Sequence, residues 1–303
     1  MKINSGEIIK KMRKEMGLSQ EDFAQQLFIS VRQLARIESG EANMDVWQFI
    51  STLELLGHPT EDFWLLYLSS SEYDSYRSYK RLKLQLKNGS MSEASGIIAD
   101  IEKGPLIKQP FIRQFIAMVK AASNPDTPPA QALEELLQVM RMSKPHYDES
   151  KISEYRMTYN EVSIALCMTG CMSDLGQHDR AASIIQAMIK SRESAQVSEE
   201  DKAAIFPFMY FVLSQVLIEA GRFGEALKVC NQTLDMCREY NNMKNIPEIL
   251  FSIANCYFKL GEEEHIYKTH LVRAYHAAYA IGKNEAAKRI KDDAETVYGV
   301  VIA

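Results

Sequence analysis

Apolar residues recur every three to four positions along most of the chain, the spacing that places them on one face of an α-helix. The alternating pattern of a half-buried β-strand is absent over any convincing length. The pattern therefore predicts an all-α protein. In the first 68 residues it predicts five helices, over residues 6–16, 19–27, 30–38 and 45–56 and a short apolar segment over 63–68.

The second and third predicted helices follow one another with almost no loop between them. Ser19 and Ser30 stand at their starts, where a serine oxygen can accept a hydrogen bond from an N–H of the first turn. Asp22, three residues after Ser19, approaches a capping box. Gly17 and Gly40 end the first and third helices, a common role of glycine at helix ends. Two capped helices joined by a tight turn predict a helix-turn-helix.

The rest of the chain repeats a pattern of paired helices. Gly176, Gly221 and Gly261 each lie between two amphipathic stretches, and the sequence around Gly221 is similar to a tetratricopeptide repeat. Single pairs cannot bury their apolar faces, but stacked pairs can. We expect a right-handed superhelix of about five tetratricopeptide-like pairs, with a last helix over 284–298 as a cap. The pairs are predicted over residues 72–103, 110–142, 151–191, 203–240 and 246–281.

Charge is unevenly distributed along the chain. The formal net charge is −5 over 303 residues. Residues 1–40 carry seven Lys or Arg and five Asp or Glu, a balance of 7 − 5 = +2, so the remainder carries −5 − 2 = −7. The first 17 residues lack the continuous apolar stretch of a signal peptide, and we expect no run long enough to cross a bilayer. These features predict no membrane partner.

The cysteines and histidines give no sign of a catalytic or metal site. The five cysteines are odd in number and form no CxxC pair, which indicates reduced thiols in a cytoplasmic protein. Cys167 and Cys171, at i,i+4, could hold a metal, but no histidine lies at ligand spacing, so we favour apolar packing. The six histidines are scattered, and no nucleophile lies beside a base. The sequence predicts neither an enzyme nor a bound cofactor.

The stretch LSQEDFAQQLFISVRQLARIESG, residues 18–40, resembles the helix-turn-helix of the Xre and phage-repressor type. The resemblance rests on LSQ at its start, on Ile29 in the turn and on the closing Ile37, Glu38 and Gly40. It covers residues 6 to about 56. Phe28 departs from the pattern, because many members carry glycine at this point of the turn.

The resemblance implies a DNA-reading role for particular residues. In such a unit the second helix lies in the major groove and the first crosses the DNA backbone. Arg and Gln side chains at the start of the reading helix can distinguish base pairs. Basic side chains of the first predicted helix, over residues 6–16, can meet phosphates. The alternative, a merely solvated helix face, is weaker inside a complete helix-turn-helix. The predicted DNA-binding residues are Gln20, Ser30, Val31, Arg32, Gln33, Arg36, Lys10, Arg13 and Lys14.

A stack of such helix pairs is expected to line a concave groove with its first helices. Aromatic, amide and cationic side chains recur at the groove positions. Amides can pair with the backbone of an extended peptide, aromatics can accept its apolar side chains, and lysines can hold its carboxylate. The alternative is that Phe211, Phe251 and Phe258 are core between helices. The predicted peptide-binding residues are Tyr79, Lys80, Lys83, Asn160, Phe208, Phe211, Gln215, Phe251, Asn255, Phe258 and Lys259.

The order of these parts resembles the peptide-pheromone-sensing transcription regulators of the Rgg and PlcR kind. The resemblance implies a helix-turn-helix domain over 1–68, a linker over 69–75 and a tetratricopeptide-like domain over 76–303 for peptide binding and dimerisation. It also implies a cytoplasmic homodimer that binds a double-stranded DNA operator and a short signalling peptide. Two alternatives stay open: an Xre-type repressor whose repeats only dimerise, and a tetratricopeptide adaptor between proteins.

Overall fold

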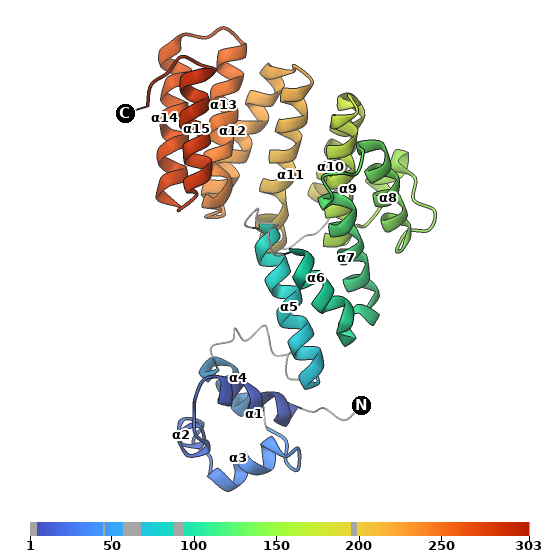
Figure 1. Cartoon of the computed structure of the whole chain (residues 1–303), viewed down its shortest axis with the longest axis vertical. Coiled ribbons are helices and arrows are strands. Elements are labelled where there is room, and N and C mark those ends of the chain that lie inside the picture. The colour runs from blue at the N-terminus through green and yellow to red at the C-terminus, as the bar shows by residue number, and fades with distance from the viewer. Residues whose placement is uncertain (1–4, 45, 57–67, 88–93, 195–198, 303) are drawn as a thin grey trace. The chain divides into compact units, whose positions relative to one another are not determined.

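The described part of the chain consists of helices joined by turns and short loops. The computed structural model describes residues 5–44, 46–56, 68–87, 94–194 and 199–302. These ranges hold α-helices and short 3-10 helices and no β-strand, so the predicted all-α class is confirmed (Figure 1). The helices fall into two compact units, Met1–Ile116 and Ala117–Ala303.

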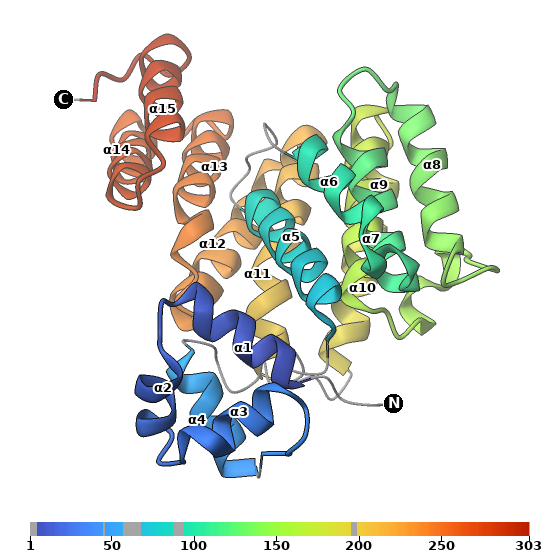
Figure 2. The same cartoon turned by 60° about the horizontal axis from the view of Figure 1, so that its bottom comes forward.

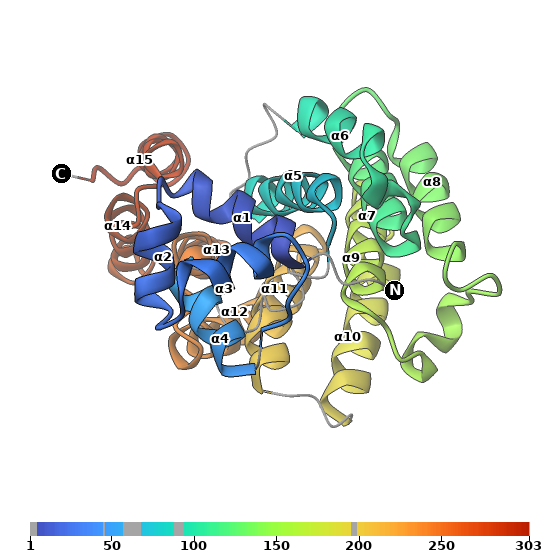
Figure 3. The same ribbon diagram turned by 90° about the horizontal axis from the view of Figure 1, so that it is seen from below.

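The amino-terminal unit begins with a group of short helices (Figures 1 and 3). Their ends lie within one residue of the predicted ends, because the apolar stripe and the caps are local signals. Their buried side chains include Ile8, Phe23, Leu34, Ile37 and Leu53. The fifth predicted segment lies outside the described residues except for Leu68. The four helices are α1 (Ser5–Glu15), α2 (Gln20–Gln26), α3 (Val31–Glu38) and α4 (Val46–Leu55).

The two predicted serine caps are present. Ser19 Oγ accepts a hydrogen bond from the Asp22 N–H at 3.0 Å, and Ser30 Oγ accepts one from the Gln33 N–H at 3.1 Å. Each bond satisfies an N–H that the helix itself leaves unpaired. Because α2 ends at Gln26 and α3 begins at Val31, the two caps and the short turn fix where α3 starts.

A helix pair completes the amino-terminal unit. Helices α5 (Ser70–Lys87) and α6 (Ala94–Lys103) pack against each other, followed by η2 (Pro105–Lys108) and by α7 (Pro110–Ser123), which crosses into the second unit. Residues 70–75 of the predicted linker belong to α5. Ion pairs join α1 to this helix: Lys11 pairs with Asp74, and Arg77 Nη1 lies 3.0 Å from Glu15 Oε1.

The carboxy-terminal unit is a row of helices in which each packs against the next (Figure 2). Helix α11 also contacts α9 and α13, the relation expected between the first helices of stacked pairs. Most described helix ends lie within four residues of the ends of the predicted pairs, but the third pair was predicted from residue 151 and its first α-helix begins at Tyr159. The helices are α8 (Pro129–Arg141), η3 (Glu149–Glu154), α9 (Tyr159–Asp174), α10 (His178–Ser194), α11 (Glu199–Glu219), α12 (Phe223–Glu239), η4 (Met243–Asn245), α13 (Ile246–Lys259), α14 (Glu264–Ala280) and α15 (Asn284–Thr296).

The predicted turn glycines occupy the turns inside these pairs. Gly176, Gly221 and Gly261 have φ angles of 74°, 72° and 76°, in the left-handed region where a side chain would be strained. Each follows the first helix of a pair and ends it. The repeat prediction therefore identified the correct positions, since this conformation is the physical reason for a glycine there.

One helix of the second unit corrects an expectation drawn from the sequence. Residues Lys202–Glu219 of α11 are long and apolar enough to cross a membrane by length and composition, although we expected no such run. In the structure α11 packs against α10, α12 and α13. Within the structure 44% of this stretch is buried, so these helix contacts account for part of its apolar composition.

Candidate functional site

The outer face of α3 carries the candidate base-reading residues. Arg32, Gln33 and Arg36 are exposed, and Val31 is 38% exposed. Ser30 is held at the start of the helix by its cap to the Gln33 N–H. On the opposite side of the same helix, Leu34 and Ile37 are buried in the domain core. Helix α3 thus presents a polar face to solvent from a fixed position. Lys10 and Lys14 are exposed on α1.

A buried ion pair between Arg13 and Glu38 connects α1 to α3. Arg13 Nε donates to Glu38 Oε1 at 2.6 Å and Arg13 Nη2 to Glu38 Oε2 at 3.0 Å, which is the bidentate geometry of a strong pair. Arg13 Nη1 also donates to the Leu18 carbonyl at 2.6 Å. Gln20 Nε2 donates to Glu38 Oε2 at 2.8 Å, so α2 joins the same network. The pKa of Arg13 is raised, first by its hydrogen bond to Glu38.

This network corrects one predicted phosphate contact. Arg13 is 5% exposed and its guanidinium is occupied by Glu38 and Leu18, so it is not available to DNA. Its role is to hold the three helices together. The sequence held one signal for this arrangement: Glu38 lies four residues after the buried Leu34, on the inward stripe of α3.

In the second unit, candidate peptide-binding residues of α11 and α13 lie together. Gln215 Nε2 of α11 donates to Ser252 Oγ of α13 at 3.0 Å. Phe211 and Phe251 pack against one apolar cluster formed around Leu250 and Ile253. This supports the alternative weighed from the sequence, that these two rings belong to the core between helices. Two other candidates differ: Phe208 of α11 is 46% exposed, and Lys259 at the end of α13 is exposed.

The segment after α15 covers some of the candidate peptide-binding residues of α13. The Tyr298 hydroxyl donates to Asn255 Oδ1 at 3.2 Å, and the Tyr298 ring meets the rings of Phe251 and Phe258 at centroid distances of 5.9 and 4.9 Å. Val300 is buried in the same cluster. Sequence reasoning missed Tyr298, because only the fold brings this segment back to α13.

The remaining candidate residues differ in their surroundings. Tyr79 of α5 is 8% exposed and meets Phe111 and Phe115 edge to face, so it is a core residue and its predicted peptide contact is wrong. Lys80 and Lys83 are exposed, with their ammonium groups over the rings of Tyr76 and Tyr79 at 5.4 and 5.5 Å. These three belong to the first unit. Asn160, at the start of α9, is half-buried.

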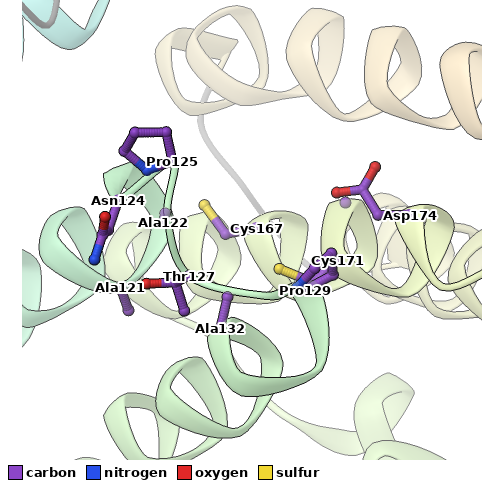
Figure 4. Close-up of a pocket in the computed structure, with 11 residues that line it drawn as sticks. Ala121, Ala122, Asn124, Pro125, Thr127, Pro129, Ala132, Cys167, Cys171 and Asp174 are labelled. Carbon is purple, nitrogen blue, oxygen red and sulfur yellow. The ribbon is translucent and has the colours of Figure 1, made fainter.

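A pocket of about 420 Å³ lies between α7, α8 and α9 (Figure 4). Cys167, Cys171 and Asp174 of α9 line it opposite the loop that carries Asn124 and Thr127. Burial, and secondarily the neighbouring Cys171, raises the pKa of Cys167 to about 11, so at neutral pH this thiol is protonated. Cys167 is half-buried and lines the pocket beside Cys171. All five cysteines are free.

Comparisons with known proteins match both parts of this architecture. A family model for helix-turn-helix domains matches residues 9–46. The structure of PlcR from Bacillus thuringiensis in complex with the peptide PapR7 and DNA matches with a TM-score of 0.66 at 16% identity, covering 95% of this chain and 99% of that chain. The structure of ComR from S. thermophilus with DNA and its signalling peptide ComS gives 0.58 at 14% identity, covering 95% and 97%.

A third structure extends the same likeness. The SHP pheromone receptor Rgg2 of Streptococcus dysgalactiae matches with a TM-score of 0.50 at 14% identity and covers 97% of this chain and 99% of that chain. No curated protein sequence matches. Residues 9–46 thus match the helix-turn-helix family model, and the chain has the all-helical fold of PlcR, ComR and Rgg2.

Proposed function

We propose that this chain is a DNA-binding transcription regulator whose amino-terminal helix-turn-helix reads a double-stranded operator. The observation that carries the proposal is the exposed face of α3, where Arg32, Gln33 and Arg36 project from a helix whose other side is anchored by the buried Arg13–Glu38 pair. Arginine matches the acceptors of guanine, and glutamine matches the donor and acceptor of adenine. PlcR and ComR, which share the fold, have been solved in complexes with DNA.

Sequence selection from random DNA tests this proposal. The full-length chain is incubated with duplexes that hold a randomised 30-base-pair core, and bound DNA is amplified over successive rounds. We expect enrichment of one motif with two-fold symmetry, because a dimer places two reading helices about 34 Å apart along the duplex. A pool that stays random after several rounds would exclude a sequence-reading regulator.

The second part of the proposal is that the repeat domain binds a short linear peptide along α11 and α13. Its support within the chain is an exposed aromatic ring on one helix, Phe208 of α11, and an exposed cation on the neighbouring helix, Lys259 of α13. PlcR and ComR are matched in structures with a bound peptide. We further propose a cytoplasmic homodimer in which peptide binding changes operator affinity. Such a switch requires that the peptide binds one state more tightly.

Removing the exposed Phe208 ring is expected to weaken peptide binding. The probe is a heptapeptide selected from a random library by the full-length chain, and binding is followed by calorimetry. Because burying a Phe side chain contributes about 1.5–3 kcal/mol, Phe208→Ala should reduce affinity roughly tenfold or more. Tyr279→Ala, which removes another exposed aromatic from α14, is the matched control and should change nothing.

The DNA and peptide selections together also distinguish the two alternatives, a repressor whose repeats only dimerise and an adaptor between proteins. A chain that selects a DNA motif but no heptapeptide is a repressor whose repeats only dimerise. A chain that selects peptides but no DNA motif, and retains its partners after Arg32→Ala with Gln33→Ala, is an adaptor. The proposal predicts that the wild-type chain selects both a DNA motif and a heptapeptide. Phe208→Ala should then lose mainly peptide affinity, and Arg32→Ala with Gln33→Ala should lose mainly DNA affinity.

A further inference from the structure

The turn of the helix-turn-helix holds an aromatic residue in a glycine conformation. Phe28 has a φ angle of 55°. Its N–H donates to the Gln25 carbonyl at 3.1 Å, and the N–H of Ile29 donates to the Ala24 carbonyl at 3.0 Å. These two bonds form the Schellman ending of α2, in which the residue at the position of Phe28 must be left-handed. A residue with a Cβ is strained there.

Other helices of this chain end in the same way but with suitable residues. The same pair of bonds surrounds Gly17, Gly40, Gly176, Gly221, Gly261 and Gly282, each with positive φ. At the end of α12 the position is taken by Asn241, a residue type that tolerates this conformation. Among the described residues, Phe28 is the one aromatic side chain with positive φ. Six of the eight helix ends of this kind among the described residues thus use glycine.

Packing does not explain the exception. Phe28 is 97% exposed, the highest value among the large apolar side chains of the described residues. A buried ring could offset backbone strain through the apolar surface it removes from water, but an exposed ring cannot. Strain that persists without a stabilising contact inside the chain points to a function outside it.

The position of Phe28 indicates which partner its ring meets. Phe28 stands two residues before Ser30, the cap of α3, and next in order are Val31, itself partly exposed, and the exposed Arg32. Where the start of α3 enters a major groove, the preceding turn lies at the groove rim. Thymine presents its C5-methyl group there, and phenylalanine is among the side chains that contact it.

We propose that Phe28 is a DNA-contacting residue whose ring packs on an apolar edge of the operator, either a thymine C5-methyl or the adjacent deoxyribose. This inference rests on the proposed function. The ring and Val31 supply an apolar contact beside the hydrogen bonds of Arg32 and Gln33. The strained backbone aims the ring away from the domain and toward the groove, so the turn itself takes part in recognition.

Substitutions at Phe28 should move stability and DNA affinity in opposite directions. Phe28→Gly relieves the strain, so the melting temperature of the full-length chain should rise by a few degrees. Its affinity for the duplex selected by the wild-type chain, measured by fluorescence anisotropy, should fall roughly tenfold through loss of the ring contact. Phe28→Asn should behave like Phe28→Gly, because Asn accepts the same backbone. Phe28→Tyr keeps a ring and should bind within about twofold of wild type.

A base-analogue scan distinguishes the two contacts. Each thymine of the selected duplex is replaced in turn by uracil, which lacks only the C5-methyl group. A methyl contact predicts that the wild-type chain loses affinity at one position per half-site and that Phe28→Gly shows no further loss at that position. A deoxyribose contact predicts that Phe28→Gly binds more weakly than wild type by the same factor on every duplex of the scan.

Two results would overturn the inference while leaving the proposed function intact. One is that Phe28→Gly binds the selected duplex as tightly as wild type. The other is that its weaker binding is fully accounted for by weaker self-association in sedimentation equilibrium, which would make Phe28 a protein-contacting residue. If the wild-type chain selects no motif, the proposed function fails first, and this inference falls with it.

Discussion

Replacing Arg32 and Gln33 with alanine is expected to reduce operator affinity on the order of 100-fold. Each bidentate contact to a base edge contributes about 1–3 kcal/mol, and about 1.4 kcal/mol corresponds to tenfold in affinity. Both side chains are exposed on α3, so their removal leaves the core unchanged. The measurement is anisotropy on the duplex selected by the wild-type chain, at fixed salt because phosphate contacts make affinity salt-dependent.

A matched control separates base reading from general charge. Arg113→Ala removes an exposed arginine from α7, outside the helix-turn-helix, and should leave affinity within about twofold. Lys14→Ala removes one proposed phosphate contact, so it should weaken binding to selected and random duplexes alike. Equal losses on both duplexes for the Arg32→Ala, Gln33→Ala variant would mean that these residues add charge and do not read sequence.

Arg13→Ala is expected to destabilise the helix-turn-helix by about 3–5 kcal/mol. The substitution leaves the Glu38 carboxylate buried without the bidentate donor that compensates its loss of hydration. Such a loss is a large part of the total stability of an ordinary domain. Urea unfolding of the full-length chain, followed by far-UV circular dichroism, measures the loss.

Substituting both partners shows whether the stability comes from the charges of the ion pair or from the packing of its side chains. Arg13→Met together with Glu38→Leu should recover most of the lost stability, because a well-packed apolar pair can replace a buried ion pair. Lys14→Ala, its exposed neighbour on α1, should change the unfolding midpoint little. Equal midpoints for Lys14→Ala and Arg13→Ala would contradict the buried network.

Local signals in the sequence predicted the helices well. Ser19 and Ser30 mark the starts of α2 and α3, and Gly176, Gly221 and Gly261 mark the turns of three pairs, because capping and left-handed backbone depend on a few neighbouring residues. Lys10 and Lys14 were also correctly placed on the exposed side of α1. These features can be predicted without knowing which helices pack against each other.

The errors concern side chains whose environment depends on distant segments. Arg13 lies among lysines in the sequence, and only the approach of α3 through Glu38 turns it inward. Tyr79 was assigned to a groove, but Phe115 covers it. Asn255 and Phe258 face Tyr298, some forty residues further along the chain. Helical periodicity shows that a position lies on a face, but it cannot show what that face meets.

Repeating the DNA selection with Gln33→Arg tests most directly whether α3 reads bases. Glutamine pairs with adenine and arginine with guanine, so a reading residue changes the selected base when it is changed. We expect the motif selected by Gln33→Arg to differ from the wild-type motif at one base pair in each half-site, from adenine to guanine. Selection of the same motif by both proteins, with unchanged preference at every position, would contradict base reading by α3.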